Sequence, residues 1–380
     1  MKILFYNKGT LMLDDIVHAL KAQGHQVDVF TYRFEDKDYY ENAEFYEQFS
    51  RKLKAGGYDR VISTNFFPLP AKLCHEQGIL YVAWSYDSPL ESGFEEYFAY
   101  DTNRIYLFDR KEAENYRKRG FTNVFHLPLA VNTARLDALR FSVSDQRKYS
   151  ADISFVGNLY ASSLDTLTVA ASDYIKGYIE CMVQTQIGLY GCYLLEQLAT
   201  DEVVDALNAS FRKIGQTKYR LNRRGLAFEV AKEVTNFERT TLLSVLGETH
   251  QVKFYSRDRG NVENVEHCGI VMYHNEMPGV FRYSKLNLNP TLRCIQSGIP
   301  LRALDIVGAG GVLLSNYQSE LAEYFTDGES VILYGSLEEA VEKADYYLAH
   351  LDCLAVIAEK GREIAKKCFR FEDRIRMLTE

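Results

Sequence analysis

Three charged side chains, Arg293, Arg302 and Asp305, lie in a stretch typical of a strand, a loop, a helix, a glycine break and a second strand, SKLNLNPTLRCIQSGIPLRALDIVGAGGVLLSN. Gly298 and Pro300 precede the predicted helix, and proline is favoured at the first helical positions. The free N–H groups of a helix N-terminus bind anions, and the planar guanidinium of Arg302 matches a phosphate group. Asp305, one turn later, is spaced to pair with Arg302 or to bind ribose hydroxyls. The stretch predicts a phosphate-binding site; the alternative is a surface Arg302–Asp305 ion pair that contributes less than about 1 kcal/mol.

A second set of polar residues follows predicted strands in the same half of the chain. Gly157 and Asn158 come directly after the run DISFV, and glycine lets the backbone approach a phosphate closely. The alternative for this pair is an ordinary turn between a strand and a helix. Arg282 closes a short predicted helix and Asn289 ends a strand, so we predict that one of Arg282, Asn289 and Arg293 contacts the bound ligand.

These residues are positioned by two series of alternating strands and helices, which predict an α/β fold. In the first series, a helix at 14–23 ends at Gly24 and the strands are 2–6, 26–32, 60–64, 80–85, 104–108 and 123–127. In the second, a helical insertion occupies about 162–250 and the strands are 152–156, 252–255, 269–273, 285–288, 311–314 and 330–334. Strands separated by helices imply right-handed crossovers and parallel sheets. We therefore predict two Rossmann-like, doubly wound domains that face a ligand-binding cleft at the carboxyl ends of their strands.

The composition is that of a soluble two-domain protein, because 380 residues exceed the usual single core and 47% of them are hydrophobic. We place the first domain at 1–135, a linker at 136–150, the second domain at 151–365 and a C-terminal helix at 366–380. A net charge of -8 argues against nucleic acid as a partner. Seven scattered cysteines without a CxxC pair favour reduced thiols in the cytoplasm. No apolar run approaches the ~18 residues of a membrane span, and the N-terminal MKILFYN is typical of a strand rather than a secretion signal.

Several sequence blocks carry a resemblance to a known family. They are KILFYNKGT, GHQVDVFTY, STNFFPLPAKLC, YVAWSYDSPL, IYLFDR, HLPLAVN, DISFVGNLY, HNEMPGVFRYSKLNLNPTLRCIQSGIPLRALDIVGAGGVLLSNYQ, LAEYFTDGESVILY and AVEKADYYLAH. The chain resembles GT-B glycosyltransferases of the CgeB-like group, named after a spore-maturation protein of bacteria. The resemblance covers most of the chain except about 162–230. It implies transfer of a sugar from a nucleotide-diphosphate sugar, most often UDP-linked, held mainly by the second domain.

The resemblance also suggests roles for single residues of the second domain. Many retaining GT-B enzymes carry an E-x7-E motif whose second acid binds the ribose, and here the second acid falls on Asp305 while the first falls on Ser297. Tyr255 ends a strand at the place where such enzymes bind the base of the nucleotide. The alternative for Tyr255 is packing in the core. Arg239 is a lesser candidate for phosphate binding.

In the first domain the resemblance implies that an acceptor is bound. Asp87 follows a strand at the place where a general base would lie if the reaction inverts at the anomeric carbon; the alternative is an aspartate that caps a Ser-Pro turn. Asn7 and Gly9, in the first turn, and Asp15 are further acceptor-side candidates, although helix-dipole pairing also explains Asp15. His126 is a candidate for contact with the donor sugar or a satisfied structural histidine.

The implied class needs no cofactor and no metal, because helix N-termini and cationic side chains cradle the diphosphate. Asp36 and Asp38 spell the DxD metal signature of the other glycosyltransferase fold, but their charged loop RFEDKD predicts a solvated turn. The acceptor is a protein, a glycan or a small molecule. Two alternatives remain open: a nucleotide-sugar epimerase or hydrolase of the same fold, and a non-catalytic binding protein, which the missing first acid at Ser297 favours.

Overall fold

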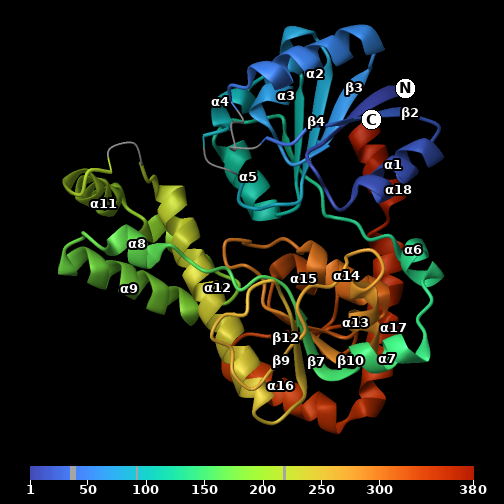
Figure 1. The fold of residues 1–380 in the computed structure, drawn as a ribbon, viewed down its shortest axis with the longest axis vertical. Coiled ribbons are helices and arrows are strands. Elements are labelled where there is room, and N and C mark those ends of the chain that lie inside the picture. The colour runs from blue at the N-terminus through green and yellow to red at the C-terminus, as the bar shows by residue number, and fades with distance from the viewer. Residues whose placement is uncertain (35–39, 91–92, 217–219) are drawn as a thin grey trace. The chain divides into compact units, whose positions relative to one another are not determined.

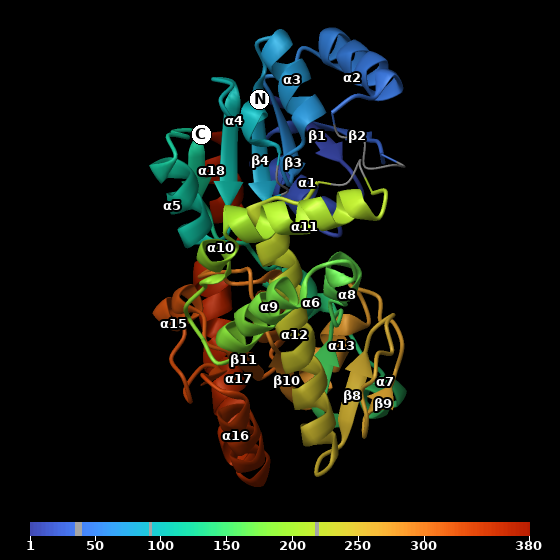
Figure 2. The same cartoon turned by 90° about the vertical axis from the view of Figure 1, so that its left-hand side faces the viewer.

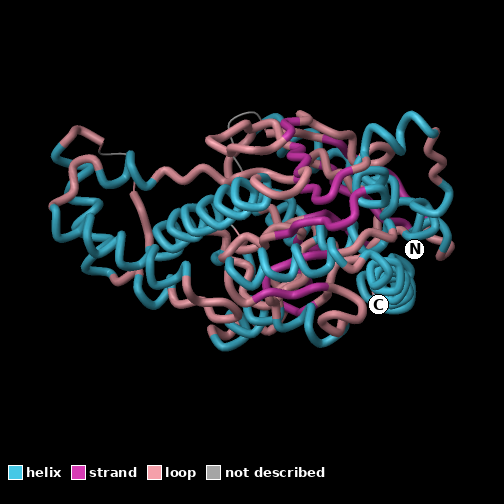
Figure 3. The backbone as a smooth tube through the Cα atoms, turned by 90° about the horizontal axis from the view of Figure 1, so that it is seen from below, coloured by secondary structure: helices cyan, strands magenta, loops and turns pink. Residues whose placement is uncertain are grey.

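The structure is a computed structural model that describes residues 1–34, 40–90, 93–216 and 220–380. The chain divides into two compact units. Unit 1 comprises Met1–Thr133, Gly298–Leu304 and Ala365–Glu380, and unit 2 comprises Ala134–Ser297 and Asp305–Ile364. Both chain termini therefore lie in unit 1 (Figures 1 and 3). Each unit contains one six-stranded sheet.

The sheet of unit 1 has the strand order β2-β1-β3-β4-β5-β6, and every neighbouring pair is parallel. Its strands are β1 (Lys2–Asn7), β2 (Gln26–Thr31), β3 (Arg60–Thr64), β4 (Leu80–Ser85), β5 (Asn103–Leu107) and β6 (Val124–His126). The connecting helices are α1 (Leu13–Ala22), α2 (Ala43–Gly56), α3 (Pro68–Glu76), α4 (Glu95–Phe98) and α5 (Arg110–Lys118). The central strands β3 and β4 are buried along nearly their whole length because helices cover both faces of such a sheet.

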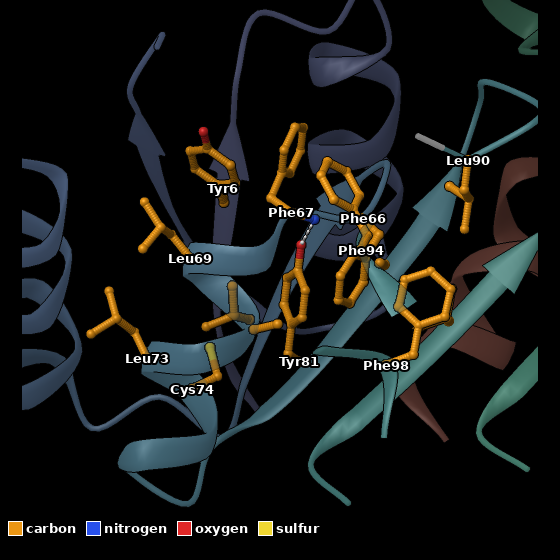
Figure 4. Packing of buried hydrophobic residues seen from close by; sticks show 14 of the residues in the cluster. Tyr6, Phe66, Phe67, Leu69, Leu73, Cys74, Tyr81, Leu90, Phe94 and Phe98 are labelled. Carbon is orange, nitrogen blue, oxygen red and sulfur yellow. Dashed lines mark hydrogen bonds between the residues drawn. The ribbon is translucent and has the colours of Figure 1, made fainter. Parts of the chain in front are cut away.

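A cluster of aromatic side chains fills the core of unit 1 beside β3 and β4 (Figure 4). Phe66, Phe67 and Phe98 are nearly fully buried, and burial of such a ring stabilises the fold by about 1.5–3 kcal/mol. The Tyr81 hydroxyl accepts a hydrogen bond from the Phe67 N–H at 3.1 Å and lies 2.7 Å from the Ser63 hydroxyl. The segment that follows β3 is thus held by both packing and hydrogen bonds.

The end of the chain completes unit 1. Helix α18 (Phe371–Thr379) packs against α1, and the Arg60 guanidinium donates to the carbonyl of Leu378 at 2.8 Å. The Phe371 ring meets the edge of Trp84, the single tryptophan, with a centroid distance of 6.2 Å. The last helix therefore contributes to the core of the unit that contains the first strand.

The sheet of unit 2 has the order β12-β11-β10-β7-β8-β9, again with parallel pairs throughout. Its strands are β7 (Ala151–Val156), β8 (Val252–Tyr255), β9 (Glu266–His267), β10 (Ser284–Asn289), β11 (Leu313–Asn316) and β12 (Ile332–Tyr334). The helices of this part of the chain are α6 (Thr133–Ala138), α7 (Val143–Tyr149), α13 (Met277–Tyr283), α14 (Leu301–Ala309), α15 (Ser319–Tyr324), α16 (Leu337–Ala349) and α17 (Leu351–Cys368). The first turn of α14 and the last residues of α17 belong to unit 1. The predicted fold class, two doubly wound α/β domains, is confirmed.

One predicted strand of the second sheet is wrong. Residues 269–273 form a loop, and the short edge strand β9 lies just before them, paired with β8. The apolar run that suggested a strand is exposed instead, with Ile270 and Met272 61% and 63% accessible. An apolar run predicts burial, but it does not predict which of two neighbouring segments forms the edge strand of a sheet.

The predicted helical insertion of the second domain consists of α8 (Leu164–Thr168), α9 (Asp173–Ile187), α10 (Leu195–Leu198), α11 (Asp201–Lys213) and α12 (Arg223–Gly247). The side chains of Ser172, Thr200 and Asn222 cap the N-termini of α9, α11 and α12. Figure 2 shows α9 and α11 beside the long helix α12, and these helices share an apolar core of their own. Among the described residues, no helix combines the length and apolar character that a membrane crossing requires.

Glu276 directly precedes α13, and its carboxylate joins the loop before this helix to Lys148. Its carboxylate accepts a hydrogen bond from the Met272 N–H at 2.9 Å and lies 3.2 Å from the Lys148 ammonium. The Met272 hydrogen bond, opposed in part by burial and supported by Lys148, lowers the pKa of Glu276. A lowered pKa contributes stability above the unfolded value, and that contribution is lost as the pH falls.

We therefore expect Glu276→Gln to lower the free energy of unfolding by less than about 1 kcal/mol at pH 7, since the pair is partly exposed. The difference from the wild type should shrink below about pH 4, where the wild-type carboxylate is protonated as well. Urea denaturation at the two pH values measures it. An equal difference at both would contradict the assigned role of the charge.

Candidate functional site

The second sheet reverses its strand order between β7 and β10, and open α/β sheets bind ligands outside the carboxyl ends of strands at such a switch point. Gly157 and Asn158 leave the carboxyl end of β7, and Asn289 ends β10. The structure thus brings together at one edge three residues that the sequence singled out. Asn158 is exposed there, whereas Asn289 is buried.

Arg239, from α12, joins the two loops at this switch point. Its guanidinium donates to the carbonyl of Asn158 and, at 3.0 Å from Nε, to the carbonyl of Pro290. The Tyr160 ring lies against it, 4.8 Å from centroid to guanidinium carbon. Because Arg239 is only 7% exposed, its positive charge lies behind the loops, which it holds in place. The sequence could not show that the backbone carbonyls of these loops would be its partners.

The loop after β10 is tied to the neighbouring strand β11. The Asn289 side-chain amide donates to the Ser315 hydroxyl at 3.1 Å, and the Thr291 N–H donates to the Asn316 side chain at 2.7 Å. These buried hydrogen bonds fix the path of the chain where it leaves the sheet. The predicted contact residue Asn289 therefore shapes the loop with its side chain.

Arg293, farther along the same loop, forms a buried ion pair with Glu238 of α12. Its Nε lies 3.0 Å from the carboxylate, and the two side chains are 5% and 2% exposed. Arg293 also donates to the carbonyl of Leu189 at 2.9 Å and lies over the Tyr190 ring at 3.8 Å. The Tyr334 hydroxyl donates to the other oxygen of Glu238 at 3.0 Å. The guanidinium thus anchors the loop to the insertion from behind.

The two tyrosines of this network are neutral hydrogen-bond donors. Burial, together with the Glu238 carboxylate, raises the pKa of Tyr190 and that of Tyr334. The Tyr190 hydroxyl donates to Glu238 at 3.2 Å. Each oxygen of the buried carboxylate therefore has a partner, as a charge removed from water requires.

Close packing surrounds Gly157 and Tyr255. A Cβ atom on Gly157 would lie 3.1 Å from the Phe155 ring and 3.7 Å from Arg239, so packing alone accounts for the glycine. Tyr255 ends β8, is 4% exposed, and its carbonyl accepts from the Gly157 N–H at 3.1 Å. Burial raises the pKa of Tyr255.

Helix α14 carries Arg302 and Asp305, and Gly298 lies in the loop that precedes it. Gly298 packs so tightly that a Cβ atom would lie 2.8 Å from the Phe108 ring and 2.9 Å from the Asp109 Cα. Arg302, the second residue of α14, is half-buried. Asp305 is 6% exposed and accepts a hydrogen bond from the Tyr273 hydroxyl at 2.8 Å. Tyr273 lies in the loop that follows β9, so this loop adds a residue that the sequence did not suggest.

A carboxylate reaches Ser297 from another element. The Ser297 hydroxyl donates to the Glu320 carboxylate at 2.8 Å, and the Glu320 N–H donates to the Ser297 carbonyl at 3.1 Å. Glu320 belongs to α15 and is 1% exposed. Sequence spacing around position 297 could not reveal it, because it follows the next strand, β11.

Arg282 is not part of this edge. It is the penultimate residue of α13, just before β10 begins, and its guanidinium donates to the carbonyls of Leu136 at 3.0 Å and Ala309 at 3.3 Å. The length of β10 separates it from Asn289. The expectation that Arg282 faces the ligand-binding edge is corrected, because the C-terminal end of a helix that directly precedes a strand lies at the amino end of that strand.

The first sheet has its switch point between β1 and β3. Asn7 ends β1, and its side-chain oxygen accepts from the N–H groups of Gly9 at 2.8 Å and Thr10 at 3.0 Å. Gly9 has φ 116°, which favours glycine. Asp15 is 3% exposed and accepts from the Asn132 amide at 2.7 Å. The turn after β1 is thus preformed.

Asp87 also lies at this edge, two residues after β4, and it is exposed. Asn65, the first residue after β3, donates to its carboxylate at 2.6 Å. Asn65 is not among the residues predicted from the sequence; the signal for it is an asparagine directly after a buried strand, in the block STNFF.

His126 ends β6 at the same edge and is half-buried. The DxD residues Asp36 and Asp38 lie outside the described residues. In the described part of the chain, no group of three or more His, Cys, Asp or Glu side chains could hold a metal ion.

Solved structures share this fold over nearly their whole length. Sucrose-phosphate synthase from Thermosynechococcus elongatus has a TM-score of 0.60 at 12% identity, covering 100% of this chain and 97% of that one. WaaG, a glycosyltransferase involved in lipopolysaccharide biosynthesis, has a TM-score of 0.55 at 14% identity, with coverages of 99% and 98%. Anabaena HepE, in complex with UDP and glucose, has a TM-score of 0.52 at 13% identity, with coverages of 100% and 98%.

A family model described as glycosyl transferase-like matches residues 223–380. Residues 223–380 therefore resemble glycosyl transferases, and the whole chain has the GT-B fold of these solved structures. The matched segment contains α12, the loop after β10 and α14. No curated protein sequence matches the chain. The predicted enzyme class is confirmed.

Proposed function

We propose that this glycosyltransferase transfers a sugar from a nucleotide-diphosphate sugar, of the UDP-linked kind, to an acceptor that is a protein, a surface glycan or a small molecule. We also propose that it belongs to the CgeB-like group, acts in the cytoplasm and needs no metal. One observation carries the donor proposal: two strand-end loops and the N-terminus of α14 follow β7 and β10, the strands at the switch point. The HepE structures, which include complexes with UDP and UDP-glucose, support the choice of uridine. Seven free cysteines support the cytoplasm.

In this proposal the diphosphate binds at the N-terminus of α14. Backbone N–H groups and the Arg302 guanidinium neutralise the charge that grows on the departing diphosphate, which is where fixed positive charge accelerates such a reaction. Asp305 binds the ribose hydroxyls, with Tyr273 orienting its carboxylate. Asn158, in the loop after β7, is a further donor contact in this proposal. Arg239 and Arg293 act indirectly, because their guanidinium groups hold the loops from behind.

The acceptor binds at the edge of unit 1. The exposed carboxylate of Asp87 accepts a hydrogen bond from the acceptor hydroxyl, and Asn7 and Gly9 supply the rigid turn after β1. Asp15, buried in α1 and bonded to Asn132, and His126, at the end of β6, are the other acceptor-side residues of this proposal.

A thermal-shift panel of UDP-glucose, UDP-galactose, UDP-N-acetylglucosamine, GDP-mannose and ADP-glucose tests the donor proposal. At about one hundred times its dissociation constant, the true donor should add about 2.7 kcal/mol to the free energy of unfolding. The stabilising sugar is then incubated with and without candidate acceptors, and UDP release and acceptor mass are measured. A transferase forms a glycosylated acceptor, whereas an epimerase or hydrolase consumes the donor alone. If no nucleotide sugar is bound or consumed, the proposal fails.

A further inference from the structure

Asn65 has an unusual backbone conformation at the switch point of the first sheet. Its φ is 64°, in the left-handed region, although it is not a glycine. Residues other than glycine are uncommon there, and such conformations gather at functional sites. The following residues Phe66 and Phe67 are 1% and 5% exposed in the aromatic cluster, and Figure 4 shows the Phe67 N–H bonded to Tyr81. The fold therefore imposes the conformation of Asn65.

The side chain of Asn65 has a defined orientation. Its oxygen accepts from the N–H groups of Tyr86 at 2.7 Å and Asp87 at 3.1 Å, and from the Ser85 hydroxyl at 3.2 Å. Three donors identify this atom as the oxygen, so the amide nitrogen points the other way. That nitrogen donates to the Asp87 Oδ2 at 2.6 Å. One side chain thus fixes both the backbone and the carboxylate of Asp87.

The surroundings of Asp87 are buried, but Asp87 itself is exposed. Ser85 is 1% exposed, and Ser88 is 8% exposed with its hydroxyl donating to the buried Glu112 carboxylate at 2.6 Å. Asp87 Oδ1 makes no hydrogen bond or ion pair to any residue that the structure describes. A carboxylate with one oxygen fixed and the other accessible is suited to accept a hydroxyl group in one orientation.

We propose that Asn65 is a positioning residue: it holds the Asp87 carboxylate so that its second oxygen accepts the hydroxyl of a hydroxyl-bearing acceptor. This inference rests on the proposed function. It adds that the acceptor oxygen is oriented by a pair of side chains that follow two neighbouring strands, β3 and β4. The direction of the hydrogen bond within this pair is also part of the proposal. Asn65 must donate, and Asp87 must accept.

The test is Asn65→Asp, which keeps the shape and the three accepted hydrogen bonds but replaces the donating amide with a carboxylate. At pH 8 the two carboxylates repel each other. As the pH falls, the pair binds one proton, because like charges raise the pKa of such a pair, and the introduced acid can donate again. UDP release is measured from pH 5.5 to 8 with the nucleotide sugar that raises Tm most in the panel, alone and with methyl hexosides as acceptor probes.

We expect Asn65→Asp to slow UDP release at least about tenfold at pH 8, with an unchanged KM for the donor, and to approach the wild-type rate at about pH 5.5. The double variant Asn65→Asp, Asp87→Asn restores an amide–carboxylate pair and thus stability, but should remain slow because the carboxylate is misplaced. Asn264, another left-handed asparagine with φ 60°, provides the matched control Asn264→Asp, whose rate should equal that of the wild type.

A ratio of Asn65→Asp to wild-type rates that is the same at every pH overturns the positioning role, even if the donor is turned over. A double variant as fast as the wild type also overturns it. If the wild type releases no UDP from any UDP sugar, the proposed function fails, and this inference fails with it. The two failures are therefore distinguishable.

Discussion

Arg293→Met is expected to lower the free energy of unfolding of unit 2 by about 3–5 kcal/mol, because removal of one partner leaves an uncompensated buried charge on Glu238. The two side chains are 5% and 2% exposed, so water cannot solvate the remaining carboxylate without disrupting the core. The hydrogen bond to Leu189 and the contact with Tyr190 are lost at the same time. Urea denaturation followed by circular dichroism measures the change.

Two further variants separate charge from packing in this prediction. Arg293→Met combined with Glu238→Gln removes both charges and should recover a large part of the loss, because a neutral pair has a far smaller desolvation cost. The exposed pair of Arg51 and Glu47, 73% and 72% accessible, is the matched control, and Arg51→Ala should cost at most about 0.5 kcal/mol. A loss below about 1 kcal/mol for Arg293→Met would refute the structural role of the ion pair.

Arg302→Ala is expected to lower kcat/KM for the donor by about 10²–10³, the usual effect of removing one group that stabilises developing negative charge. Arg302→Lys should recover part of this, because lysine keeps the charge but cannot bind two phosphate oxygens with a planar fork. The rates come from UDP release at several donor concentrations. The free energy of unfolding is measured alongside, so that a change in folding is not mistaken for a change in catalysis.

The control for this prediction is Arg51→Ala, which removes an arginine from α2, far along the chain from α14. It should leave kcat/KM unchanged. If Arg302→Ala releases UDP within about twofold of the wild-type rate, the diphosphate is not neutralised by Arg302, and the donor proposal must rest on the helix N-terminus alone.

The sequence by itself determined the fold class of this protein. Buried runs such as KILFY and DISFV alternate with amphipathic helices, and that pattern has few solutions other than parallel sheets covered by helices. It also placed Asn158, Asn289 and Arg302 correctly at strand or helix ends, because the residue that follows a parallel strand lies at the carboxyl edge of its sheet. The local sequence pattern was therefore sufficient to predict the position of a residue wherever that position depended on a single helix or strand.

Only the tertiary structure shows which arginine side chains hold the strand-end loops of unit 2 from their buried side. Arg239 and Arg293 look alike in sequence to Arg302, but both point into packed surroundings and bond to carbonyls or to Glu238. Their partners come from helices and loops fifty or more residues away, so no spacing along the chain announces them. The prediction placed Arg282 at the carboxyl edge of the sheet. It lies instead at the amino end of β10, because α13 leads directly into that strand.

Two carboxylate contacts also depend on the tertiary structure alone. Glu320 meets Ser297 from the following βα unit, and Asn65 meets Asp87 from the neighbouring strand. Parallel sheets bring the ends of successive strands to one edge, and therefore join side chains that are distant in sequence. The hydrophobic pattern of the sequence predicts at which edge of a sheet a residue lies. The order of the strands in the sheet determines which residues are its neighbours there. That order depends on the packing of the whole sheet.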